Sequence, residues 1–86
     1  MNIKQMEIDY KRYLIYAKKD EIKSWKNTIQ DYKINIAELV LSEAKKEEIN
    51  KYVKFIEKHK KDIENLELEI ANLVIEIDKL RKEINN

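Results

Sequence analysis

Isoleucine recurs at every seventh position through the second half of this chain, at residues 49, 56, 63, 70, 77 and 84. Such a repeat is typical of a coiled-coil helix, because it keeps one apolar seam turned toward a partner helix. Its strict spacing also predicts a left-handed supercoil. The residues three positions after each isoleucine complete the seam, and they are Tyr52, His59, Leu66, Leu73 and Leu80.

The composition is typical of long helices. The 86 residues include no Gly and no Pro, which are the residues that most often interrupt helices, while 41% are charged and 43% are hydrophobic. A chain of this length forms one small domain at most. We therefore expect residues 1–86 to be a single all-α domain. The absence of Cys excludes a disulfide framework and permits a reducing compartment, and we expect a cytoplasmic protein.

The first half shows an apolar stripe with a period near 3.6 residues, which predicts a straight amphipathic helix. Asn2 is expected to cap its start. Aromatic side chains are frequent in this stripe. Its members are Ile3, Met6, Tyr10, Leu14, Ala17, Ile22, Trp25, Ile29, Tyr32, Ile36 and Leu39.

The two patterns do not join in phase. The isoleucine spacing of the first half, carried forward, reaches Glu43 and Asn50, whereas the second seam restarts at Ile49. We expect helix 1 at about 2–40, a turn at about 40–42 and helix 2 at about 43–84, with Ser42 as the N-cap of helix 2. The predicted fold is an antiparallel helical hairpin in which residue i faces about residue 82 − i. A continuous rod is the alternative.

The second helix carries more apolar residues than one seam needs. Leu68, Ala71 and Ile75 lie nearly opposite the seam. In the expected register they fall near Ile8 and Ile15, which lie off the main stripe of helix 1. A bounded apolar patch with a charged rim is typical of a contact surface. We therefore predict that these five residues mediate self-association or bind a partner.

Lysines surround the expected turn, and they are candidates for contact with phosphate or with a partner protein. The net charge of the chain is only +1. The single histidine, His59, occupies a seam position without a second His or Cys nearby in sequence, so we expect it to set the register rather than bind metal. The lysines are Lys45, Lys46, Lys51, Lys54 and Lys58.

No motif for catalysis, phosphate binding or metal binding is present, so we expect no enzyme activity, no cofactor and no small-molecule substrate. No apolar run is long enough to cross a membrane. We expect a small helical interaction protein that forms a homodimer as a four-helix bundle and binds another protein as an inhibitor, adaptor or scaffold. Phages and mobile elements often encode such proteins. A nucleic-acid-binding regulator that uses the lysine-rich end and a purely structural parallel coiled coil are the alternatives.

Overall fold

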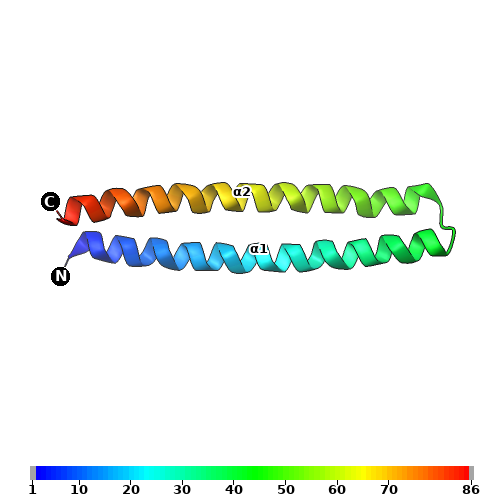
Figure 1. Ribbon diagram of the computed structural model, residues 1–86, viewed down its shortest axis with the longest axis horizontal. Coiled ribbons are helices and arrows are strands. Elements are labelled where there is room, and N and C mark those ends of the chain that lie inside the picture. The colour runs from blue at the N-terminus through cyan, green and yellow to red at the C-terminus, as the bar shows by residue number, and fades with distance from the viewer. Residues whose placement is uncertain (1, 86) are drawn as a thin grey trace.

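The protein folds into a hairpin of two long antiparallel helices. The computed structural model describes residues 2–85, in which α1 (Ile3–Leu41) and α2 (Lys46–Asn85) lie side by side along their whole lengths (Figure 1). The molecule measures 65 × 15 × 12 Å, and no strand occurs among the described residues. The expected all-α hairpin is thus confirmed, and the continuous rod is excluded.

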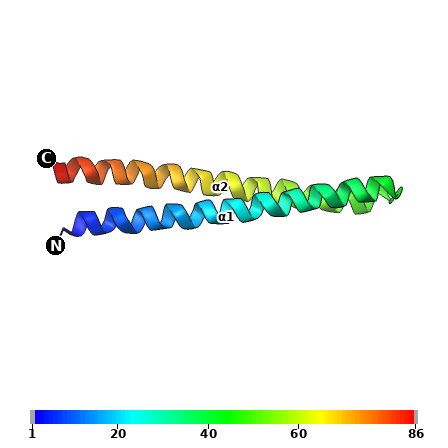
Figure 2. The same ribbon diagram turned by 60° about the horizontal axis from the view of Figure 1, so that its bottom comes forward.

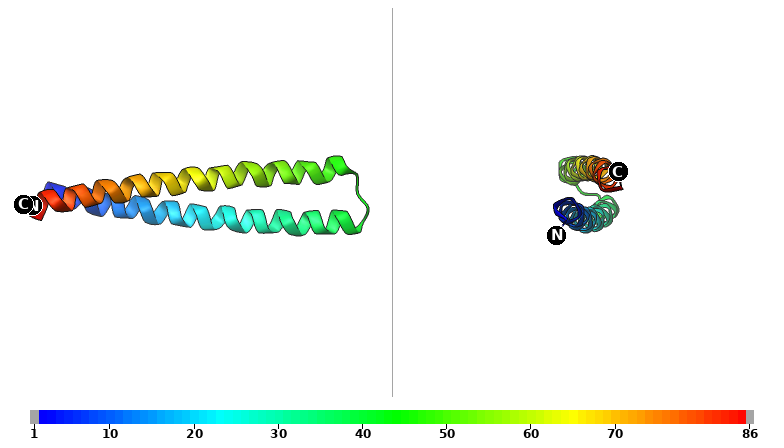
Figure 3. Two further views of the ribbon diagram at one scale, coloured as in Figure 1. Left: turned by 45° about the horizontal axis from the view of Figure 1, so that its top comes forward. Right: turned by 90° about the vertical axis from the view of Figure 1, so that its left-hand side faces the viewer.

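The two helices wind around each other. They lie apart at the open end and overlap near the turn in Figure 2, whereas the left view of Figure 3 shows the reverse. This winding keeps the seven-residue seam of α2 against α1. Within the hairpin, α1 thus covers the seam of α2.

The core lies in two clusters along the seam, which together contain most of the buried side chains. Near the chain ends, Ile8, Ile15 and Ile77 are buried together. Toward the turn, Ile29, Ile56 and Ile63 form the second cluster, flanked by partly buried residues. Those flanking residues are Ile22, Trp25, Tyr32 and Ile36.

The seam of α1 differs from the expected stripe in its N-terminal half. Ile8 and Ile15 are buried at 1% and 9% exposure, whereas Tyr10 is 62% exposed. The expected 3.6-residue stripe was therefore wrong here, because a helix that follows a heptad seam must present its own residues at seven-residue spacing. The isoleucines of α1 provide that line at positions 8, 15, 22, 29 and 36.

The register also differs from the expected one. Trp25 packs on His59, and Lys11 reaches Glu76, so the facing residues lie two and five positions further along α2 than expected. The reason is the place of the turn. The residues between the helices are 42–45, beyond the expected 40–42, which shifts every pairing toward the C-terminus.

Hydrogen-bonded caps define both the start and the end of α1. Asn2 caps its start as expected, because its side-chain Oδ1 accepts from the backbone N–H of Lys4 and of Gln5. Ser42 caps the end of α1 and does not begin α2, so its expected role was wrong. Glu43 N–H donates to the Val40 carbonyl and Ala44 N–H donates to the Leu39 carbonyl, which is the Schellman pattern.

Glu43 occupies the position of this pattern that glycine usually takes. Its φ is +57°, in the left-handed region, where a Cβ atom costs about 1–2 kcal/mol. Glu43→Gly removes that cost, which stabilises the folded hairpin. Glycine also increases the entropy of the unfolded chain, which offsets part of this gain. We therefore expect a net increase of about 0.5–1 kcal/mol in unfolding free energy. Urea denaturation followed by circular dichroism measures it. Glu43→Ala keeps the Cβ atom and is expected to give no comparable gain, and an equal gain in both variants contradicts the explanation.

Candidate interaction surfaces

Three ion pairs join the helices along one side of the open half. Lys4, Lys11 and Lys18 occupy the seam positions of α1 between the isoleucines, and each reaches sideways to a glutamate of α2. The distances between Nζ and Oε2 are 3.4 Å to Glu83, 2.8 Å to Glu76 and 2.6 Å to Glu69, respectively. These pairs join basic side chains of α1 to acidic side chains of α2 and are consistent with the antiparallel register.

The hydrogen bond that Lys11 donates to Glu76 raises the pKa of Lys11 above its ordinary value. A raised folded-state pKa stabilises the fold fully below the ordinary lysine pKa, and the contribution is lost as the pH rises through the folded-state pKa. We therefore expect Glu76→Gln to be less stable than the wild type near neutral pH and to approach it in strong alkali. Unfolding free energies of both proteins across that pH range test this, and a constant difference contradicts it.

An aromatic cluster fills the seam toward the turn. The ring of His59 stacks on Trp25 with centroids 4.3 Å apart and planes inclined at 17°, and Tyr32 lies on it at 5.9 Å. Tyr52 and Phe55 of α2 pack around Tyr32. His59 Nδ1 lies 3.3 Å from Asp62 Oδ2. His59 therefore occupies the expected seam position, inside an aromatic stack that the sequence pattern did not reveal.

The outer face of α1, opposite its seam, comprises the exposed residues at alternating three- and four-residue steps from Ile3 to Leu41. Its half near the chain ends is apolar and consists of Ile3, Met6, Tyr10, Tyr13 and Ala17, whose four large side chains are each more than half exposed. Beyond them the charged members are Asp20, Asp31 and Glu38. This face carries no Lys or Arg.

The outer face of α2 comprises the residues at the same steps from Lys51 to Lys82, which are all exposed. Leu68 and Ile75 are its apolar members, at 62% and 54% exposure. From Lys51 to Lys82 it carries no Asp or Glu, and the next position of the same steps toward the turn is Glu47. Over these ranges each outer face carries charges of a single sign. The lysines of this face are Lys51, Lys54, Lys58, Lys61, Lys79 and Lys82.

The structure separates the five residues expected to form the contact patch. Leu68, Ala71 and Ile75 are exposed on the side of α2 away from the core. Ile8 and Ile15 are buried against α2, so their placement in an exposed patch was wrong. The shifted seam of α1 is the physical reason. Near the chain ends, α1 instead exposes Tyr10 and Tyr13. Neither residue belongs to the patch predicted from the sequence.

The predicted lysine cluster is ordered by the helix. Lys51, Lys54 and Lys58 fall on the outer face of α2, whereas Glu48 and Glu57 occupy other positions around that helix and Glu47 continues the same line toward the turn. Lys45 precedes α2 and Lys46 begins it. The sequence therefore mixes the charges along the chain, but the fold collects the lysines on one face.

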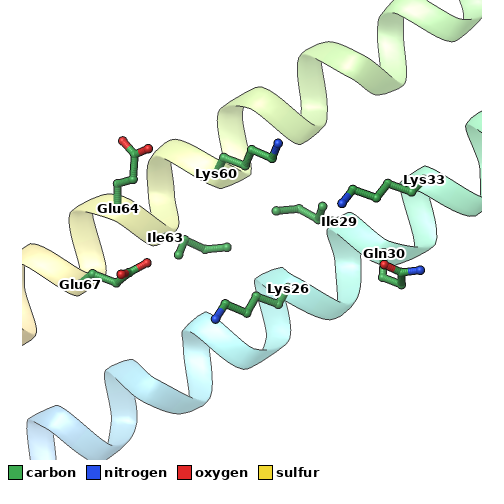
Figure 4. Close-up of a pocket in the computed structure, with 8 residues that line it drawn as sticks. All are labelled: Lys26, Ile29, Gln30, Lys33, Lys60, Ile63, Glu64 and Glu67. Atoms are coloured by element: carbon green, nitrogen blue, oxygen red, sulfur yellow. The ribbon is translucent and has the colours of Figure 1, made fainter.

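An open groove runs along one edge of the hairpin between the helices (Figure 4). Ile29 and Ile63 lie at its centre, and Lys33 of α1 and Lys60 of α2 extend toward the same part of it. Lys26 also lines it. Glu64 and Glu67 of α2 line it as well, so the groove carries charges of both signs, although within residues 2–85 no carboxylate lies within 4.0 Å of these three ammonium groups.

Residues 2–85 contain no group of three His, Cys, Asp or Glu side chains placed to hold a metal ion. Neither of the two helices contains a segment that is both long enough and apolar enough to cross a membrane. Comparison of the sequence with protein-family models finds no match, and neither do the comparisons with curated proteins and with solved structures.

Proposed function

We propose that this protein is a non-enzymatic helical interaction protein that self-associates and acts by docking the helices of other proteins. One observation carries the proposal. Both helices expose apolar residues on the face opposite their shared core, and on α1 the spacing of Ile3, Met6, Tyr10, Tyr13 and Ala17 is that of a coiled-coil seam. A single hairpin has no partner for either face.

The energetics of a small hairpin support this proposal. Seven side chains of residues 2–85 are buried, and a small core of this kind gives a domain of this size marginal stability. Docking a helix on the outer faces adds a second core and offsets that deficit. Tyr10 and Tyr13 are the strongest anchors, because tyrosine buries a large ring at low entropic cost and is enriched at interfaces. Inhibitor, adaptor and scaffold roles all use such a surface.

The double variant Leu68→Glu with Ile75→Glu tests the proposal. Because both side chains are exposed, we expect the helix content to remain while association is lost, since each contact would have to bury a carboxylate. Sedimentation velocity over a range of concentrations measures association, and circular dichroism measures helix content. Val74→Glu, at a site that is 52% exposed but off the outer face, is the matched control. A wild type that stays monomeric, or a double variant that unfolds, contradicts the proposal.

A nucleic-acid-binding role is the second candidate, and one observation favours it. The lysines of the outer face of α2 lie in one line, and among residues 2–85 only Lys82 of this set has a carboxylate partner, Asp78. Such a line can neutralise phosphates and release counterions, so binding should weaken steeply with added salt. Fluorescence anisotropy of a labelled oligonucleotide at two salt concentrations tests this role. Absence of binding at low salt excludes it.

A further inference from the structure

The two outer faces complement each other in charge and in apolar surface. We infer that the outer face of α1 binds the outer face of α2 of a second copy, with the turns of both copies at the same end. This inference rests on the proposed self-association and specifies its mode. Asp31 of one face then stands near Lys54 of the other, the α1 face carries no Lys or Arg, and from Lys51 to Lys82 the α2 face carries no Asp or Glu.

The matching groups also stand at the same height along the hairpin. Lys11 pairs with Glu76, and because the helices are antiparallel the adjoining residues Tyr10 and Ile75 lie within about 3 Å of the same height. Lys18 pairs with Glu69, which sets Ala17 and Leu68 within the same distance of one height. Two hairpins placed side by side without a shift along the axis therefore bring Tyr10 and Ala17 of one face close to Ile75 and Leu68 of the other.

The turn halves match as well. Tyr32 packs on Phe55 with ring centroids 5.6 Å apart, so the adjoining residues Asp31 and Lys54 lie within about 3 Å of the same height, a gap that a lysine side chain can span. Among residues 2–85, no carboxylate lies within 4.0 Å of the ammonium group of Lys54, and no ammonium group within 4.0 Å of the carboxylate of Asp31. Both charges are free to pair with a second copy. Opposite charges at matched heights fix the register of a helix pair even where each pair adds little energy.

Like-with-like pairing is disfavoured by the same charges. Two α2 outer faces packed with their turns together set Lys51, Lys54, Lys58 and Lys61 against identical lysines, and two α1 outer faces set Asp31 and Glu38 against identical acids. Juxtaposed like charges select against such partners. The face of α1 therefore prefers the face of α2, and the contact uses two different surfaces.

A dimer formed by a contact between two different surfaces leaves one α1 outer face and one α2 outer face unoccupied. The outer faces lie on opposite sides of the flat hairpin, since each is turned away from the shared seam. A second copy that binds through one outer face still exposes its other outer face, which can bind a third copy. Growth therefore continues as an open row or until a ring closes. The inferred assembly is thus a side-by-side row of hairpins and not a closed four-helix dimer.

Two variants test this inference, because each blocks one face and leaves the other intact. Tyr10→Glu blocks the α1 face and Ile75→Glu blocks the α2 face, at positions that are 62% and 54% exposed. We expect each variant alone to lose self-association by at least about 30-fold, since the contact would bury an unpaired carboxylate. An equimolar mixture is expected to form a 1:1 heterodimer that grows no further, because only one productive contact remains. Sedimentation equilibrium measures the species.

The controls and the opposing outcomes are distinct. Tyr16→Glu and Val74→Glu, at exposed positions off the outer faces, should keep the wild-type growth beyond a dimer. If the wild type associates but either blocked variant alone still forms a dimer, the inference fails while the proposed function stands. If the wild type stays monomeric at about 1 mM, both fail. A monomeric wild type whose oligonucleotide binding is abolished by Lys54→Glu assigns the α2 face to nucleic acid and also overturns the inference.

Discussion

Replacing Ile8 with alanine is expected to lower the unfolding free energy by about 3 kcal/mol, within the range for buried isoleucine to alanine. Ile8 is the most buried side chain of the hairpin, at 1% exposure, and packs in one cluster with Ile15 and Ile77. The variant loses the transfer free energy of the removed atoms and leaves a cavity that two long helices close poorly. Because a small hairpin has little stability in reserve, this loss should unfold much of the population at 37 °C.

Ile3→Ala provides the matched control, because it makes the same chemical change on the same helix at a side chain that is 72% exposed. Its expected effect is within about 0.5 kcal/mol. Urea denaturation at several protein concentrations separates the folding of the hairpin from any association. A larger loss in Ile3→Ala than in Ile8→Ala would show that the 3.6-residue stripe, and not the isoleucine heptad, forms the core of α1.

The fold of α2 could be predicted from sequence because a single pattern governs it. Isoleucine at every seventh position admits one seam, and the structure buries Ile56, Ile63 and Ile77 on that seam. The break in phase near Glu43 likewise required a turn. Its position was missed by two to three residues because α1 ends without glycine, and the left-handed conformation falls on Glu43 itself.

The seam of α1 was harder to predict because two apolar lines compete in its first half. One line runs through Ile3, Met6 and Tyr10, and the other through Ile8 and Ile15. Lysine occupies the seam positions between the isoleucines of the second line, so that line resembles a polar face in the sequence. Lys11 and Lys18 fit there because their long apolar stems cover the core while the ammonium groups reach Glu76 and Glu69. Only the heptad of the partner helix decides between the two lines.

The choice between these two apolar lines of α1 also determined how much of the interaction surface could be predicted from the sequence. Leu68 and Ile75 were recognisable, since α2 has a clear seam and they lie opposite it. Tyr10 was assigned to the core and Ile8 to the surface, which is the reverse of the structure. The single-sign charges of the outer faces were hidden as well, because the sequence alternates Lys and Glu and only the helical positions separate them. A heptad reading of both helices would have revealed all of these features.

Replacing Trp25 with alanine is expected to lower the unfolding free energy by about 3 kcal/mol, which is typical of a large aromatic side chain removed from a core. Trp25 belongs to the cluster of Ile29, Ile56 and Ile63, and its ring covers His59. Tyr16→Ala, at a ring that is 60% exposed and off the outer faces, is the matched aromatic control and should change stability by less than about 0.5 kcal/mol. Denaturation monitored by circular dichroism compares the two variants, and a comparable loss in both would argue against the aromatic core.

A double-mutant cycle of Trp25→Ala with His59→Ala then measures whether the stacked pair fixes the register. Rings stacked at 4.3 Å should show a coupling of about 1 kcal/mol beyond the sum of the separate losses. A coupling of this size means that the fold favours the one alignment in which the only tryptophan meets the only histidine. Additive losses would instead mean that each ring merely fills space, and the register would then depend on the turn and on the ion pairs of Lys11 and Lys18 alone.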